Sequence, residues 1–143
     1  MGRFRVLEEI ALADLALEIE GDGLDDLFAT AARALAELTV DPATLDGRVE
    51  RRVTLDAPAL DLLLYDWLAE LIFLKDRDRD IFPEVEVRVT AGTPSRLEAT
   101  LRGGRIERGA TVLHVDPKAP TFHRLAVEPL PAGRWRATVV IDV

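Results

Sequence analysis

The residues with the clearest potential for chemistry are two aspartates at opposite ends of the chain. Asp14 follows the small apolar residues 11–13, and Asp142 lies within the strand-like run 135–143. Chain termini are often close in space, so the strands carrying these acids are expected to be neighbours, and their carboxylates would then meet. Two carboxylates and main-chain oxygens suit calcium or magnesium, and the terminal carboxylate of Val143 would add a ligand. The alternative is two unrelated surface acids.

A second pair of acids, Asp66 and Glu70, has the i, i+4 spacing that places both side chains on one stripe of a helix. Like charges at this spacing destabilise a helix, so a cation such as an arginine is expected opposite them. An ordinary solvent-facing stripe or a buried salt bridge would give the same pattern. The spacing alone leaves these interpretations open.

One lysine and the histidines complete the candidates. Lys118 lies in the run Asp-Pro-Lys-Ala-Pro, where the prolines restrict the backbone and hold the position of the lysine. His114 and His123 have no serine or cysteine nucleophile motif nearby, which is typical of packed or surface histidines. The Gly-Asp-Gly run at 21–23 lacks the lysine and the third glycine of a phosphate-binding loop.

The composition narrows the chemistry further. The chain has 143 residues, no cysteine and two histidines, and its 26 acidic and 18 basic residues give a formal net charge of −8. Disulfides, thiolate metal sites and a three-histidine zinc site are therefore excluded within one chain. Any metal is expected to be a hard cation bound by oxygen. The negative charge argues against direct nucleic-acid binding and favours a basic protein partner.

The length predicts a single domain over residues 1–143, because a chain of this size can bury a core without disulfides. No linker, repeat or low-complexity tract divides it. The first residues contain no long apolar signal region, so we expect a cytoplasmic protein with no membrane partner.

Hydrophobic periodicity predicts the elements that position these residues. A 3.6-residue period over 24–38 predicts an amphipathic helix with Asp25 and Asp26 in its first turn. Alternation of apolar and polar residues predicts strands, with the terminal run 135–143 the most strand-like of them. The predicted strands and extended segments cover residues 4–10, 15–20, 49–55, 85–89, 97–101, 112–115, 122–127 and 135–143.

The second predicted helix begins near the cap candidate Asp56 and includes Pro58 in its first turn. From 60 to 74 it is apolar nearly all round, so it is expected to be the central helix, buried on most sides. The charged run 75–80 is expected to be a solvated loop. The predicted fold class is α+β, with two helices packed on a mostly antiparallel or mixed sheet of roughly seven strands.

Several segments together resemble the archease family, in order and spacing, over essentially the whole chain. The most distinctive are Asp66-Trp67-Leu68 and the Lys-Ala-Pro-Thr-Phe-His block at 118–123. The other matching segments are Ala13-Asp14 before an alternating strand, the helix containing Asp26-Leu27-Phe28, the remainder of 63–73, and the ending Val139-Val140-Ile141-Asp142-Val143.

Archeases act as protein cofactors of RtcB-type RNA ligase, which joins RNA ends in tRNA splicing and RNA repair. The resemblance implies that this chain is not itself an enzyme, but promotes guanylation of the active-site histidine of the ligase and allows multiple turnovers. It also implies a divalent cation, expected to be calcium with magnesium or manganese as alternatives, bound by Asp14, Asp142 and Val143. The residues implied to contact or activate the ligase are Lys118, Asp66, Glu70 and His123.

The chain departs from the family at one motif. The His-Thr-Ala-Asp of the family reads Ala11-Leu12-Ala13-Asp14 here, so the histidine and the threonine hydroxyl are both absent. Neither side chain is present to hydrogen-bond to the metal ligands and orient them. Weaker metal binding or weaker activation of the ligase is the expected consequence.

Two other functions remain open. The first is a small metal-dependent hydrolase that uses Asp14 and Asp142, although only His114 or His123 could serve as its general base. The second is a chaperone or assembly factor for an RNA-modifying enzyme, with the apolar helix and an acidic rim as its docking surface.

Overall fold

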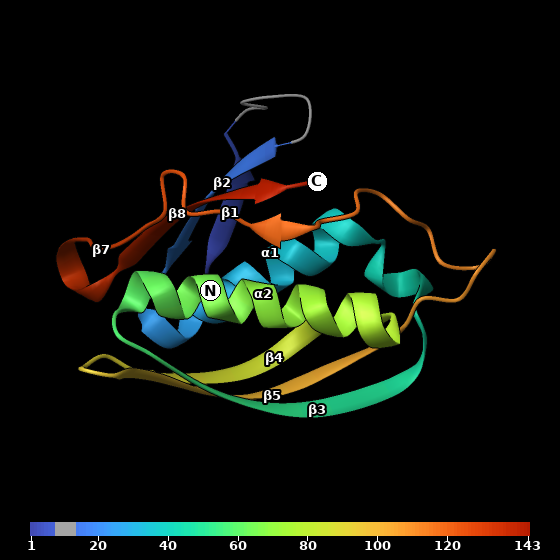
Figure 1. Ribbon diagram of the computed structural model, residues 1–143, viewed down its shortest axis with the longest axis horizontal. Coiled ribbons are helices and arrows are strands. Elements are labelled where there is room, and N and C mark those ends of the chain that lie inside the picture. The colour runs from blue at the N-terminus through green and yellow to red at the C-terminus, as the bar shows by residue number, and fades with distance from the viewer. Residues whose placement is uncertain (8–13) are drawn as a thin grey trace.

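The computed structural model describes residues 1–7 and 14–143, and places the helices between antiparallel sheets (Figure 1). The first sheet is formed by β1 (Arg3–Val6), β2 (Asp14–Gly21), β8 (Trp135–Asp142) and β6 (Ala119–Pro120), and β7 (Ala126–Pro129) also pairs with β8. The second sheet has the order β3 (Asp46–Ala57), β5 (Ser95–Arg105), β4 (Asp80–Thr90). All pairings between these strands are antiparallel.

The predicted α+β class is confirmed, but the strands are divided between the β2–β8 sheet and the β3–β5–β4 sheet instead of forming one. The reason lies in helix α2 (Leu60–Asp78), which is apolar on most sides and therefore needs cover from more than one layer. Trp67 is fully buried, and its indole N–H donates to the carbonyl of Phe28, 2.9 Å away on helix α1.

Helix α1 (Leu24–Thr39) follows the predicted period, and its periodic apolar residues form much of the core. The acids of its first turn have a further role, because they accept hydrogen bonds from backbone N–H groups. Asp25 accepts from Val89 on β4 at 2.7 Å, and Asp26 accepts from Gly2 and Asp22. A short 3₁₀ turn, η1 (Pro42–Thr44), follows the helix.

The expected cap of the second helix is wrong. Asp56 belongs to β3, and α2 begins at Leu60 after Ala59, which has no side chain able to cap it. The expected solvated loop at 75–80 is also wrong, since α2 continues to Asp78 and Arg79 ends it with a left-handed φ of 61°. Lys75 and Asp80, both assigned to that loop, are buried.

The predicted strand at 112–115 is not formed. Leu113 makes only an isolated bridge to Val40, and the backbone N–H of His114 donates to the carbonyl of Thr39. The predicted strand 4–10 is confirmed in part as β1, which ends at Val6. Residues 8–10 lie outside the described residues, as do Ala11 and Leu12 of the motif departure. A second 3₁₀ turn, η2 (Pro131–Gly133), precedes β8.

The terminal strand is confirmed, and it lies between β2 on one side and β6 and β7 on the other. Ala137, Val139 and Ile141 are buried on the face predicted to be apolar. Among the described residues, no helix is both long and apolar enough to cross a membrane.

Candidate functional site

The antiparallel register of β2 and β8 places Asp14 directly opposite Asp142. Directly opposed residues of antiparallel strands project from the same face, with Cβ atoms typically about 4.5–5.5 Å apart. Both aspartates are half-buried, and neither forms an ion pair with any of the described residues. Like charges opposed in this way are destabilising, so the arrangement favours a bound cation.

Lys118 lies beside this carboxylate pair. Its backbone N–H donates to the carbonyl of Asp142 at 2.7 Å, and the next residue, Ala119, pairs with Asp142 across the β6–β8 ladder. Its side chain is exposed and forms no ion pair with the residues that the structure describes. The lysine is therefore held at the site by its backbone, with its ammonium group available.

The donor set fits a hard cation, though only in part. Within residues 1–7 and 14–143, no cluster of three or more histidine, cysteine, aspartate or glutamate side chains could hold a metal. Asp14 and Asp142 supply carboxylate oxygens, and Val143, half-buried, directly follows Asp142. Calcium takes six to eight oxygen ligands, so main-chain oxygens, water or a partner would have to complete the coordination.

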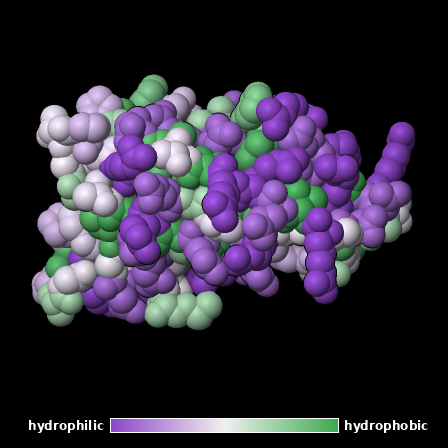
Figure 2. Space-filling model, turned by 90° about the horizontal axis from the view of Figure 1, so that it is seen from below, coloured by the Kyte–Doolittle hydropathy of each residue, from purple (hydrophilic) through white to green (hydrophobic). Residues whose placement is uncertain are grey.

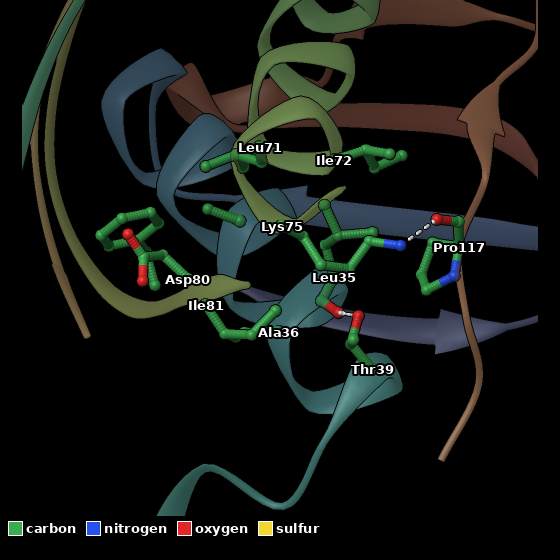
Figure 3. Close-up of a pocket in the computed structure, with 11 residues that line it drawn as sticks. Leu35, Ala36, Thr39, Leu71, Ile72, Lys75, Asp80, Ile81 and Pro117 are labelled. Carbon is green, nitrogen blue, oxygen red and sulfur yellow. Dashed lines mark hydrogen bonds between the residues drawn. The ribbon is translucent and has the colours of Figure 1, made fainter. Parts of the chain in front are cut away.

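A buried lysine that the sequence analysis missed anchors the segment leading to Lys118. The Lys75 side chain is only 8% exposed; its ammonium group contacts the carboxylate of Asp116, donates to the carbonyl of Pro117 at 2.7 Å, and lies 3.0 Å from Asp76. Figure 3 shows Lys75 extending from α2 toward Pro117. The interaction ties the end of α2 to the backbone just before the candidate site.

The signal for this lysine was present in the sequence. Leu68, Leu71, Ile72 and Lys75 have the i, i+3, i+4, i+7 spacing of one helical face, which places the lysine on the buried side. Alternating charges in the following residues obscured the pattern. The hollow beside Lys75 has a volume of about 20 Å³, enough for a water molecule but not for a substrate.

Asp66 and Glu70 lie on the outer stripe of α2, and within the described residues no hydrogen bond joins them to the carboxylate pair. Asp66 is exposed and Glu70 is half-buried. The cation expected opposite them is absent among the described residues at ion-pair distance, because the stripe faces solvent. The pKa of Arg77 is nevertheless raised, first by its hydrogen bond to Asp78 and to a lesser extent by the charge of Glu70.

The histidines do not join the carboxylates in a common site. His114 is exposed and bonded through its backbone to the end of α1. His123 is exposed in the loop after β6, next to Phe122, whose ring stacks on Tyr65 of α2 with centroids 4.2 Å apart. This stack could not be predicted from the sequence, because no local pattern links residues so distant in the chain.

The fold and site define a class of small α+β domain, in which antiparallel sheets enclose α1 and α2 and a carboxylate pair lies on neighbouring strands. Residues 4–143 match the archease protein family, and the chain belongs to this family.

Relatives of known name support the assignment. The chain is 36% identical over 131 residues to the protein archease of Archaeoglobus fulgidus, covering 92% of this chain and 93% of that protein. It is 32% identical over 134 residues to the protein archease of Methanosarcina mazei, covering 92% and 90% of the respective chains.

Solved structures agree in fold. The solution structure of a protein from Methanobacterium thermoautotrophicum superposes with a TM-score of 0.78 at 28% identity, over 98% of each chain. A crystal structure of an archease, described as a possible chaperone, from Thermotoga maritima gives a TM-score of 0.65 over 97% of this chain and 98% of that one. At 22% identity, this second likeness supports the fold alone.

Proposed function

We propose that this chain is a protein cofactor, not an enzyme, that activates an RtcB-type RNA ligase by promoting guanylation of the ligase's active-site histidine. The observation that carries the proposal is the Asp14–Asp142 register with Lys118 bonded beside it. Membership of the archease family supports the choice of the ligase as the proposed partner. Its setting would be tRNA splicing and RNA repair, with multiple turnovers of the ligase as the result, and a cytoplasmic location remains our prediction.

Asp14, Asp142 and Val143 would hold the divalent cation, with calcium as the first expectation and magnesium or manganese as alternatives. Such an ion, when bound, supplies positive charge that stabilises negative charge developing on transferring phosphoryl groups. Lys118 has a free ammonium group among the described residues and would pair with phosphate oxygens of the nucleotide. Asp66, Glu70 and His123 are proposed to contact the ligase, not the nucleotide.

The charge of the chain supports a protein partner. A formal net charge of −8 repels an RNA backbone but complements a basic, RNA-binding enzyme. We therefore do not expect this chain to bind RNA by itself. In this scheme the ligase binds the RNA substrate and carries the reacting histidine, while this chain contributes the carboxylates and the lysine.

The test is a guanylation assay with the purified cognate ligase, GTP and a divalent cation, with and without this chain. We expect the wild type to accelerate guanylation, and the Asp142→Asn variant to lose roughly tenfold or more of that acceleration, equivalent to about 1.4 kcal/mol. Glu84→Gln, an exposed acid on β4, is the control and should stimulate as the wild type does. Unchanged stimulation by Asp14→Asn and Asp142→Asn would contradict the proposed site.

A chaperone role is the second candidate, favoured by the exposed aromatic residues Phe73 and Phe122, which are 49% and 64% exposed. A chaperone would raise the yield of refolded ligase without changing the guanylation rate of ligase that is already folded. Measuring both quantities in parallel separates the two functions.

A further inference from the structure

The outer side of α2 carries side chains that the core does not use. We define this outer α2 face as Tyr65, Asp66, Glu70 and Phe73, together with Phe122 from the loop after β6. The helical members are spaced so that they share one side of the helix, and all are half-buried or exposed. Phe73 on the helix and Phe122 beside Tyr65 are exposed aromatic side chains, which are typical of an interaction surface.

The Phe122–Tyr65 stack joins this face to the candidate site. The rings are nearly parallel, with an interplanar angle of 9°. At the other end of the same short segment, the N–H of Lys118 bonds to Asp142, and Thr121 N–H donates to the carbonyl of Val140 at 2.9 Å. The segment 118–122 therefore connects β8 to α2, so a partner seated on the outer α2 face is brought next to Lys118.

The face combines aromatic rings with acids whose charge no direct contact with a described residue neutralises. Neither Asp66 nor Glu70 forms an ion pair with any described residue. Phe73 already holds one guanidinium, since Arg77 lies over its ring with 5.0 Å from Cζ to the ring centroid. Rings beside carboxylates are a favourable environment for arginine, which stacks on the ring while pairing with the acid.

The β3–β5–β4 sheet provides a contrast. The outer surface of the β3–β5–β4 sheet, seen in Figure 2, carries hydrophilic side chains over much of its area. Several of its charges are paired with one another: Arg102 contacts Glu50 and Glu86, and Arg96 contacts Glu98. Charges that are paired in this way have little to offer a charged partner.

We propose that the outer α2 face docks a basic, arginine-bearing surface of the RNA ligase, so that Lys118 and the carboxylate pair are presented to the ligase's nucleotide. This inference rests on the proposed function and deepens it by assigning the contact surface. The occupant is argued from charge: unpaired acids around aromatic rings complement the positive surface of an RNA-binding enzyme.

The experiment measures the dissociation constant of the complex with the purified cognate ligase, alongside the guanylation rate. Asp66→Lys is expected to weaken binding by roughly tenfold or more, because like charges would oppose each other in the contact. Phe73→Ala is expected to weaken it by about tenfold, as truncation of an aromatic anchor commonly does.

Matched controls come from elsewhere on the surface. Glu84→Lys makes the same change of charge at an exposed acid on β4 that forms no ion pair among the described residues. Leu113→Ala removes an apolar side chain that is 60% exposed and does not belong to the outer α2 face. Both controls should bind the ligase within about twofold of the wild type, as is usual for surface positions outside a contact.

Every outcome bears on the proposal. Selective weakening by Asp66→Lys and Phe73→Ala supports it, whereas equal weakening by Asp66→Lys and Glu84→Lys would show a long-range charge effect and overturn it. Wild type that stimulates guanylation, with both α2 variants binding normally, would overturn the docking face and leave the proposed function intact. A wild-type chain that neither binds the ligase nor stimulates guanylation would overturn both the docking face and the proposed function. A dimer in solution that Phe73→Ala dissociates would assign the face to a second copy instead.

Discussion

Asp80 and the Asp14–Asp142 pair are strand-end carboxylates that the fold treats in opposite ways. The Asp80 side chain is fully buried, accepts a hydrogen bond from Arg105 at 3.0 Å and lies 3.3 Å from Arg51. Asp14 and Asp142 are half-buried and face each other, without an ion pair among the described residues. The buried Asp80 is neutralised by arginines of the same chain. The Asp14–Asp142 pair has no such partner among the described residues, and a bound cation could neutralise it.

The largest effect is expected from removing the counter-charges of Asp80. Replacing Arg51 and Arg105 together by methionine leaves a buried carboxylate unpaired, which should lower the free energy of unfolding by about 3–5 kcal/mol. Urea denaturation monitored by circular dichroism measures it. The control is Arg102→Met, whose pairs with Glu50 and Glu86 are exposed and should contribute less than about 1 kcal/mol. Similar losses of stability in the double variant and in Arg102→Met would show that burial of Asp80 does not make its ion pairs more important than exposed ones.

The next effect tests the carboxylate pair directly. A ligand that binds only the folded chain stabilises it by about 2.7 kcal/mol at 100 times its dissociation constant. Calcium should therefore raise the melting temperature of the wild type and leave that of Asp14→Asn almost unchanged. Without calcium, Asp14→Asn should be slightly more stable than the wild type, by up to about 1 kcal/mol, since it relieves the repulsion. An equal calcium shift in both proteins would place the ion elsewhere.

A smaller change in stability is expected from Lys75. This buried lysine bonds to a backbone carbonyl and to an exposed carboxylate, so removing it leaves no buried anion behind. Its partner Asp116 is 78% exposed and would be solvated after Lys75→Met, so stability should change by less than about 1 kcal/mol. Hydrogen exchange at the Lys118 amide should instead become faster, because the segment loses its anchor at Pro117. Lys75→Arg should restore protection in part. If the Lys118 amide stays protected in Lys75→Met, the contacts of Lys75 with Asp116 and Pro117 do not position the site.

The smallest effect concerns acid pH. The hydrogen bond from Arg77 lowers the pKa of Asp78, with smaller contributions from Arg51 and Arg105. A carboxyl whose pKa is lower in the folded chain stabilises that chain above the ordinary aspartate value of about 3.9 and loses this contribution as the pH falls through the folded value. Arg77→Gln should therefore weaken the fall in stability below about pH 4. Unchanged acid titrations of Asp78 by NMR would contradict this cause.

Local patterns predicted the parts of the fold that are themselves local. The period of α1 and the alternation in β8 were sufficient for both elements, and the usual closeness of chain termini led to the expectation that Asp14 meets Asp142. The charged run at 75–80 misled because short-range charge alternation outweighed the longer helical spacing that buries Lys75.

Long-range pairing was beyond the sequence. The division into the β2–β8 and β3–β5–β4 sheets depends on which strands hydrogen-bond, and the strand patterns are alike in both. The stack of Phe122 on Tyr65 and the burial of Asp80 between Arg51 and Arg105 likewise join segments that no short motif relates. The candidate site was therefore predicted as a set of residues, while its neighbourhood was not.

The place of β8 in its sheet has a consequence for the order of folding. It is the last strand along the chain, yet it hydrogen-bonds to β2, β6 and β7. During synthesis, β2 must wait with an open edge until β8 leaves the ribosome, since contacts between distant segments form late. The carboxylate pair is thus among the last features to assemble. A cation bound there would therefore stabilise only those molecules in which β8 has already paired with β2.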